Sequence, residues 1–190
     1  MNEVESKKII LFGRSFAGYL VPRAACFDSR PIAIVADAGL YDLLSGLKEM
    51  MPGTYQEVKD NNFDELNKEM ASQFNDIQKN YFFTSRMSVQ NAKSVAEYFN
   101  MLLEYSPDEI SKNIKMPAFI CAGENDKATI PQSKMLYDNI SSENKKFVIF
   151  SGSDGAGEHC EMGNQNIFYS RVFNWLEAIV NRYFIIKFNL

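Results

Sequence analysis

The chain has 190 residues, of which 46% are hydrophobic, so it can bury one sizeable core and its length suits a single domain with an insertion. The 20 Lys and Arg residues against 24 Asp and Glu residues give a formal net charge of −4 without a basic cluster, which argues against a nucleic-acid partner. Residues 1–5 are acidic and the apolar run that follows is too short for a signal peptide or a membrane span. We therefore predict a cytoplasmic protein without membrane contact.

A strand, a tight turn and a helix are predicted at the start of the chain. The apolar run 7–12 (KKIILF) leads into GRSFAG and then into a helical pattern. Such a turn holds a serine hydroxyl clear of side-chain bulk, and Gly13 and Ala17 are small enough to let strand and helix approach closely. Ser15 is therefore a candidate nucleophile, with an ordinary turn serine as the alternative. The backbone N–H of Phe16, at the start of the helix, is a candidate oxyanion donor.

A second strand is predicted over residues 31–36 (PIAIVA), and Asp37 and Asp42 follow it. From residue 42 to residue 115 the composition changes, and apolar residues recur at helical spacing. Several amphipathic helices inserted at the carboxyl end of a strand would form a lid over Ser15. The alternative is an ordinary helical layer packed on the sheet. Candidates for an apolar substrate wall, unless they are core residues, are Met50, Met51, Tyr81, Phe82 and Phe83.

The second half of the chain returns to alternating strand and helix patterns. Strands are predicted over residues 116–122 and 146–150, and helices over residues 131–140 and 166–182. The apolar tail, residues 183–190, suggests docking or an additional strand. Alternation of this kind predicts an α/β fold in three layers, with about four parallel strands and active-site loops at their carboxyl ends.

Two further residues complete a candidate catalytic set with Ser15. Asp126 follows the strand of residues 116–122, and His159, the only histidine, lies in a glycine-rich loop before the last helix. A serine hydroxyl needs a base to take its proton, and the imidazolium that forms needs a carboxylate to orient it and stabilise its charge. Serine, acid and histidine in this order, each just past a strand, predict a Ser-His-Asp triad. Asp37 and Asp42 are alternative candidates for the acid. The alternative for His159 is an ordinary loop histidine without a catalytic role.

The three cysteines predict neither disulfides nor a metal site. Cys26, Cys121 and Cys160 are odd in number and lack ligand spacing, which suits reduced thiols. We interpret Cys160, beside the histidine, as a small residue behind the base rather than a nucleophile. With a single histidine, zinc is not expected, and no cofactor is predicted.

Three segments resemble a known family: GRSFAGYLVPRAA, MPAFICAGENDKATIP, and GAGEHCEMGN before FNWLEAIV. They are similar to the carboxyl-terminal part of α/β-hydrolases related to acylaminoacyl peptidases, fermentation-respiration-switch esterases and dihydropseudooxynicotine hydrolase. The resemblance implies Ser15 as nucleophile, Asp126 as acid and His159 as base, although Ala17 stands where the family more usually has glycine. It also implies that four strands precede the elbow and that a loop among them supplies the second oxyanion donor. The chain is thus expected to be a truncated α/β-hydrolase fold.

Two functions from different classes follow. The first is a serine hydrolase, or its catalytic piece, that cleaves an ester, an amide or an activated carbon–carbon bond of a small molecule or short peptide. The second is a non-catalytic hydrolase-like binding module. For both functions, the apolar first strand, residues 8–12, is predicted to be covered on both faces of the sheet but to have no neighbouring strand at one edge. We therefore expect its edge to pair with another chain or with a preceding segment.

Overall fold

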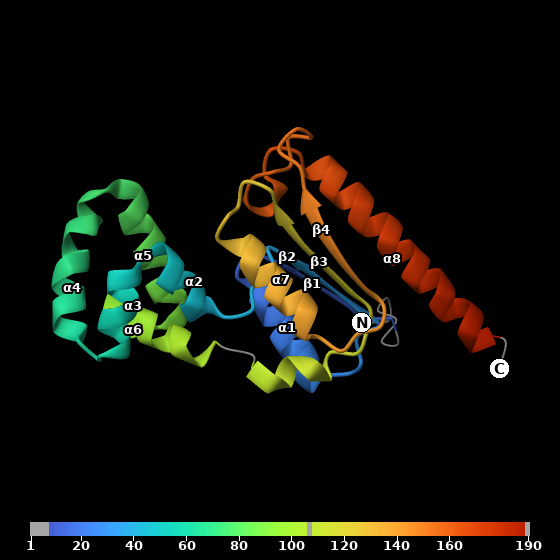
Figure 1. Ribbon diagram of the computed structural model, residues 1–190, viewed down its shortest axis with the longest axis horizontal. Helices are drawn as coiled ribbons and strands as arrows, with labels where there is room; N and C mark the ends of the chain where they lie inside the picture. Colours follow the sequence, from blue (N-terminus) through green and yellow to red (C-terminus); the bar gives the residue numbers. More distant parts are fainter. Residues whose placement is uncertain (1–7, 106–107, 189–190) are drawn as a thin grey trace. The chain divides into compact units, whose positions relative to one another are not determined.

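The chain consists of an α/β unit and a helical unit. Figure 1 shows the computed structural model, which describes residues 8–105 and 108–188. The α/β unit is Met1–Tyr41 with Pro107–Leu190, and the helical unit is Asp42–Ser106. In sequence, the helical unit therefore lies between the second and third strands.

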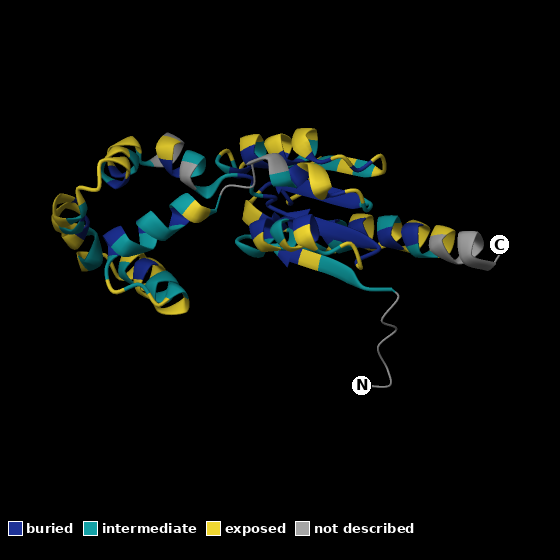
Figure 2. Cartoon of the chain, turned by 90° about the horizontal axis from the view of Figure 1, so that it is seen from below, coloured by how far each residue is buried: buried dark blue, intermediate teal, exposed yellow. Residues whose placement is uncertain are grey.

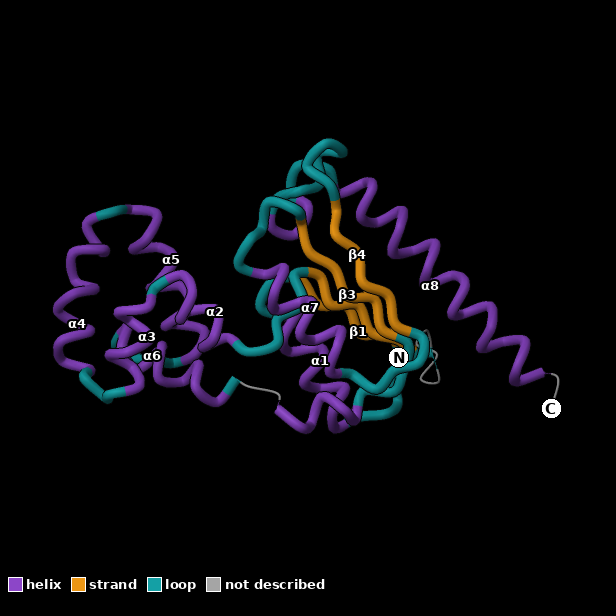
Figure 3. Tube along the Cα trace, viewed as in Figure 1, coloured by secondary structure: helices purple, strands orange, loops and turns teal. Residues whose placement is uncertain are grey.

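The α/β unit contains a sheet of four parallel strands (Figure 3). β1 (Ile10–Arg14), β2 (Ala33–Asp37), β3 (Ala118–Gly123) and β4 (Lys145–Phe150) lie side by side in the order of the sequence. The predicted α/β class and parallel sheet are confirmed. Because all four strands run the same way, their carboxyl ends, and the loops that follow them, meet at one edge of the sheet.

Helices cover both faces of this sheet. α1 (Ala17–Phe27) and α7 (Thr129–Asn139) pack on one face and α8 (Gln165–Phe188) on the other. Along β2, Ile34 and Ala36 join the core under α1 and α7, whereas Ala33 and Val35 join the core under α8. Successive strand residues point to opposite faces, so a continuous apolar strand has to be buried on both sides. Every residue of β2 and β3 is buried.

The strand and helix bounds differ from the predicted ones in two informative places. β1 continues past residue 12 to Arg14, which pairs in register with Asp37 at the end of β2. The tail does not form an additional strand, because α8 continues to Phe188. No glycine or proline follows residue 165 to end the helix, so its backbone hydrogen bonding carries on. Residues 189 and 190 of the tail lie outside the described part.

The helical unit has its own core. It is built from α2 (Leu43–Met50), α3 (Pro52–Lys59), α4 (Phe63–Ala71), α5 (Ile77–Gln90) and α6 (Val95–Met101), with 3-10 turns at Ser72–Asn75 and Leu102–Glu104. Side chains at the predicted helical spacing fill this core, among them Leu66, Met70, Val95, Phe99 and Leu102. Figure 2 shows buried residues along the inner faces of these helices and exposed ones outside. Helical periodicity thus identified the helical unit correctly.

The helical unit ends before residue 115. A 3-10 turn (Asp108–Asn113) belongs to the α/β unit, where Ile110 and Ile114 pack with the core under α1 and α7. That the helical unit acts as a lid over Ser15 stays a prediction. Within residues 8–105 and 108–188, no helix is long and apolar enough to cross a membrane.

Candidate active site

Ser15 lies at the apex of the turn between β1 and α1. Its φ of 55° is left-handed, a strained conformation that a sharp strand-to-helix turn requires. The N–H of Ser15 donates to the carbonyl of Asp37 at 3.0 Å, which fastens the turn to β2. A Cβ at Gly13 would lie 2.0 Å from the carbonyl oxygen of Ala17. The close approach of strand and helix that the small residues predicted is confirmed.

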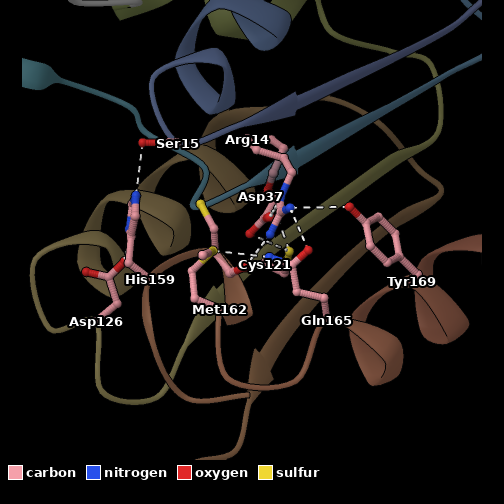
Figure 4. A network of polar contacts seen from close by, with 11 residues as sticks. Arg14, Ser15, Asp37, Cys121, Asp126, His159, Met162, Gln165 and Tyr169 are labelled. Atoms are coloured by element: carbon pink, nitrogen blue, oxygen red, sulfur yellow. Dashed lines mark hydrogen bonds and ion pairs between the residues drawn. The ribbon is translucent and has the colours of Figure 1, made fainter. Parts of the chain in front are cut away.

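Asp126 and His159 follow β3 and β4 and meet Ser15. Asp126 lies in the loop between β3 and α7, and His159 begins a 3-10 turn, η4 (His159–Glu161), after β4. His159 Nδ1 lies 2.5 Å from Asp126 Oδ2, and His159 Nε2 lies 2.9 Å from Ser15 Oγ (Figure 4). With the proton on Nδ1, the imidazole donates to the carboxylate and accepts from the hydroxyl. The structure thus brings the three predicted residues into one chain of hydrogen bonds.

The loops that carry the acid and the histidine are fastened to each other. The N–H of Asn125 donates to the carbonyl of Gly157 at 2.7 Å, and its side-chain amide donates to Glu158 at 2.9 Å. A Cβ at Gly123 would lie 2.3 Å from the carbonyl oxygen of Gly157. Any side chain at the end of β3 would therefore push the histidine loop away from Asp126.

The short contact between His159 and Asp126 shifts the pKa of both groups. Burial acts to raise the pKa of Asp126, but hydrogen bonds from His159 and Thr129 outweigh it, and the pKa of this carboxyl is lowered. The hydrogen bond to Asp126 is the largest of the causes that raise the pKa of His159 to about 10. Both shifts favour an ionised acid beside an imidazole with a strong affinity for a proton.

The rival acids have other partners. Asp37 is fully buried, and its carboxylate accepts from Arg14 Nε at 2.6 Å. Asp42 accepts from the N–H of Ser45 at 3.1 Å, close to the start of α2. Asp126 is therefore the one of the three candidate acids that contacts the imidazole.

Arg14 is part of this site, although no sequence pattern indicated its contacts. Beyond Asp37, its guanidinium donates to the carbonyl oxygen of Cys160, to Gln165 at 3.4 Å and to the hydroxyl of Tyr169 at 3.3 Å (Figure 4). Arg14 directly precedes Ser15, and Cys160 directly follows His159. One side chain thus connects the end of the nucleophile strand with the histidine turn.

The other predicted site residues lie as follows. Phe16 is the N-cap residue of α1, at the helix start where the sequence put it. Cys160 is buried in the histidine turn. Of the apolar wall candidates, Phe83 and Met51 pack in the core of the helical unit, and Tyr81 and Phe82 are exposed. The side chain of Met50 lies outside the described part of the chain.

One cluster of buried ligand-type atoms occurs among the described residues. Single ligand atoms of Asp37, Cys121 and Glu161 lie within 4.8 Å of one another. The guanidinium of Arg14 already contacts Asp37 in this cluster, and a divalent cation there would face that fixed positive charge. We assign no metal to it.

The chain is similar to several hydrolases. No family model matches its sequence. Hydrolase AcrC of Aspergillus aculeatus is 22% identical over 185 residues, which are 92% of this chain and 42% of that protein. The 2,6-dihydroxy-pseudo-oxynicotine hydrolase structure is 16% identical, with a TM-score of 0.61 over 94% of this chain and 42% of that one. The α/β hydrolase GrgF of Penicillium sp. sh18 is 20% identical, with a TM-score of 0.61 over 92% of this chain and 65% of that one.

These similarities and the parallel sheet define the fold. The chain has the fold of the α/β hydrolases that it resembles, with four parallel strands covered by helices on both faces. The chain spans less than half the length of AcrC and of the pseudo-oxynicotine hydrolase.

Proposed function

We propose that the chain carries the catalytic triad of a serine hydrolase, which cleaves an ester, an amide or an activated carbon–carbon bond through an acyl-enzyme. The observation that carries this proposal is the continuous chain of hydrogen bonds from Asp126 through His159 to Ser15, with distances of 2.5 and 2.9 Å. The similarity to proteins named hydrolases supports the reaction class. The substrate we propose is a small molecule or a short peptide.

Each residue has a defined role in this mechanism. As Ser15 Oγ attacks the carbonyl carbon, its proton passes to His159 Nε2, and the carboxylate of Asp126 stabilises the imidazolium. The imidazolium then gives that proton to the leaving group, and an acyl-enzyme remains on Ser15. Water activated by the same imidazole releases the acyl group. The backbone N–H of Phe16 is the proposed donor to the oxyanion.

A second oxyanion donor is expected from a strand segment beside β1. β1 pairs with β2 on one side, and its Phe12 side chain is 36% exposed, whereas β2 and β3 are buried throughout. An incompletely covered apolar edge favours pairing with a further strand. We propose that a preceding segment or a second chain pairs there. Removing one oxyanion donor typically slows such enzymes on the order of a hundredfold to a thousandfold.

A fluorophosphonate probe tests the proposal directly. We expect the probe to label the chain at Ser15 and Ser15→Ala to remove all labelling, because the probe reacts with a serine only when a base activates it. Ser170→Ala, which removes an exposed hydroxyl on α8, is the matched control and should be labelled like the parent chain. If the parent chain stays as inert as Ser15→Ala even in the presence of a complementing preceding segment, the serine hydrolase proposal is wrong and the binding-module alternative takes its place.

The rate of labelling should rise with pH. His159 acts as a base only when it is neutral, and its hydrogen bond to Asp126 raises its pKa to about 10. Below that pKa, the neutral fraction grows about tenfold per pH unit, so the rate should climb steadily from pH 5 to pH 8. The second-order rate constant of probe labelling at each pH measures this, with Ser15→Ala as the blank. A rate constant that does not change over this range would rule out His159 as the base.

A further inference from the structure

Glu161, two residues after His159, is a buried carboxyl without a visible donor. Its side chain is fully buried, and neither carboxylate oxygen has a hydrogen-bond partner among the described residues. Its nearest acidic neighbour is Asp37, also fully buried, and one ligand atom of each lies within 4.8 Å of the other and of Cys121 Sγ. Buried polar atoms are almost always paired, so this arrangement needs an explanation.

The charges around Glu161 do not balance if both carboxyls are ionised. Arg14 is the cation in this cluster, and its Nε already contacts Asp37 at 2.6 Å. The Cys121 thiol adds no charge, because burial raises its pKa well above the usual range. A second buried carboxylate would therefore be uncompensated, which is costly. A proton on one carboxyl removes the excess charge and turns an acceptor into the missing donor.

We propose that Glu161 is a neutral carboxylic acid that donates a hydrogen bond to the carboxylate of Asp37, and that this bond holds the histidine turn so that His159 faces Ser15. The inference concerns the position of the imidazole and does not depend on the proposed function. In this arrangement Glu161 is a positioning residue, since it acts through His159 and not on a substrate.

The backbone of the turn shows why it needs such a tether. Cys160 and Glu161 have φ values of 53° and 51°, a left-handed conformation that side-chain-bearing residues rarely adopt. Arg14 binds the carbonyl oxygen of Cys160, and the proposed hydrogen bond from Glu161 to Asp37 is the second contact that would hold this strained pair. Both contacts are anchored on strand ends, one on β1 and one on β2. Loss of the second would let the turn relax and move the imidazole away from Ser15 Oγ, which now lies 2.9 Å from His159 Nε2.

The surroundings of Glu161 agree with a bound proton. Burial, the largest cause, and the neighbouring Asp37 raise the pKa of Glu161 to about 9, while Arg14 and His159 act to lower it. The ordinary pKa of this carboxyl is 4.5. Between about pH 4.5 and pH 9 the folded chain therefore holds a proton on Glu161 that the unfolded chain has already released. Stability from this proton is fully present at low pH and is lost as the pH rises through this range.

The first test compares the pH dependence of folding in the intact chain and in Glu161→Gln. Glutamine has the same shape and can donate to Asp37 at every pH. The folding equilibrium constant of the parent chain relative to the variant should therefore fall about tenfold per pH unit from pH 5 to pH 8. Urea unfolding followed by fluorescence of Trp175, the single tryptophan, reports on the α/β unit. Glu158→Gln removes an exposed carboxylate from the same loop and is the matched control.

The second test follows His159 itself. Because the chain has one histidine, NMR signals of labelled histidine need no assignment. Above about pH 9 the parent chain should lose the downfield signal of the Nδ1 proton shared with Asp126, whereas Glu161→Gln should keep it to higher pH. Infrared spectroscopy of the parent chain at pH 7 checks whether the Glu161 carboxyl is protonated, because a buried carboxylic acid has a band of its own. This measurement does not need the variant, so it holds even if Glu161→Gln does not fold.

Each outcome decides part of the proposal. A tenfold fall per pH unit in the folding equilibrium constant of the parent chain relative to Glu161→Gln, but not relative to Glu158→Gln, together with earlier loss of the His159 signal in the parent chain, supports both parts. An equal fall relative to Glu158→Gln assigns the effect to the charge of the loop and overturns the buried proton, as does the absence of the infrared band. A slope with identical His159 signals in both proteins leaves Glu161 neutral but overturns its positioning role. One bound divalent metal per chain, found by elemental analysis, would replace the proton with a cation and overturn the proposal.

Discussion

Changing Asp126 to Asn should slow the labelling of Ser15 by about ten-thousandfold. The asparagine amide can donate to His159 Nδ1, which favours the tautomer with the proton on Nε2. That nitrogen now lies 2.9 Å from Ser15 Oγ and could no longer accept its proton. The change also removes the charge that stabilises the imidazolium. The second-order rate constant for the fluorophosphonate at pH 8 measures the effect.

Asp42→Asn is the matched control, because Asp42 follows the second strand and is a rival acid by sequence. Its carboxylate accepts from the N–H of Ser45, and asparagine can keep that bond. We expect its labelling rate to stay within a few fold of that of the parent chain. The opposite result would be slow labelling of Asp42→Asn and an unchanged labelling rate of Asp126→Asn. In that case Asp42, and not Asp126, would be the acid of the triad.

Removal of the guanidinium in Arg14→Met should destabilise the α/β unit by about 3–5 kcal/mol. The variant would leave the fully buried carboxylate of Asp37 without its cation, which costs more than the ion pair itself contributes. It would also remove the donor to the carbonyl oxygen of Cys160. The free energy of unfolding from urea titrations, followed by Trp175 fluorescence, gives the magnitude.

Arg30→Met provides the comparison for that measurement. Arg30 also pairs with an aspartate, Asp28, at 2.6 Å, but the two side chains are 79% and 34% exposed. Water solvates the remaining carboxylate when an exposed pair is broken, so its loss should have little effect. Equal losses in the two variants would show that Arg14 is no more important to the fold than a surface arginine.

The predictions that the structure bears out rest on local patterns. Four apolar runs indicated four strands because a strand covered on both faces has to be apolar throughout, as β2 and β3 are. Ser15 and Asp126 come shortly after such runs, and His159 lies in the loop that follows the fourth run. In a parallel sheet the carboxyl ends of all strands lie at one edge, so chain order predicted that these three residues lie near one another, with Asp37 and Asp42 as rival acids. Helical periodicity likewise identified the core of the helical unit.

The residues that escaped prediction depend on register and on side-chain direction. Whether Arg14 lies opposite Asp37 is decided by the pairing of β1 with β2, and a shift of one residue would separate them. Glu161 gave no signal because an acidic residue in a polar loop is ordinarily exposed. It is buried here in a tight turn, in which Cys160 and Glu161 both adopt left-handed backbone angles. Phe83, a wall candidate by composition, became core because its helix turned it inward.

The sequence by itself therefore determined the α/β class, the parallel sheet, the helical insertion and the three candidate catalytic residues. All of these follow from periodicity and from chain order, which are properties of neighbouring residues. Only the tertiary structure decided that Asp126 rather than Asp37 or Asp42 contacts His159, and that Arg14, Asp37 and Glu161 form a buried charged cluster behind the triad. Those choices depend on distances of a few ångströms between residues far apart in the chain, and strand register and loop packing set such distances.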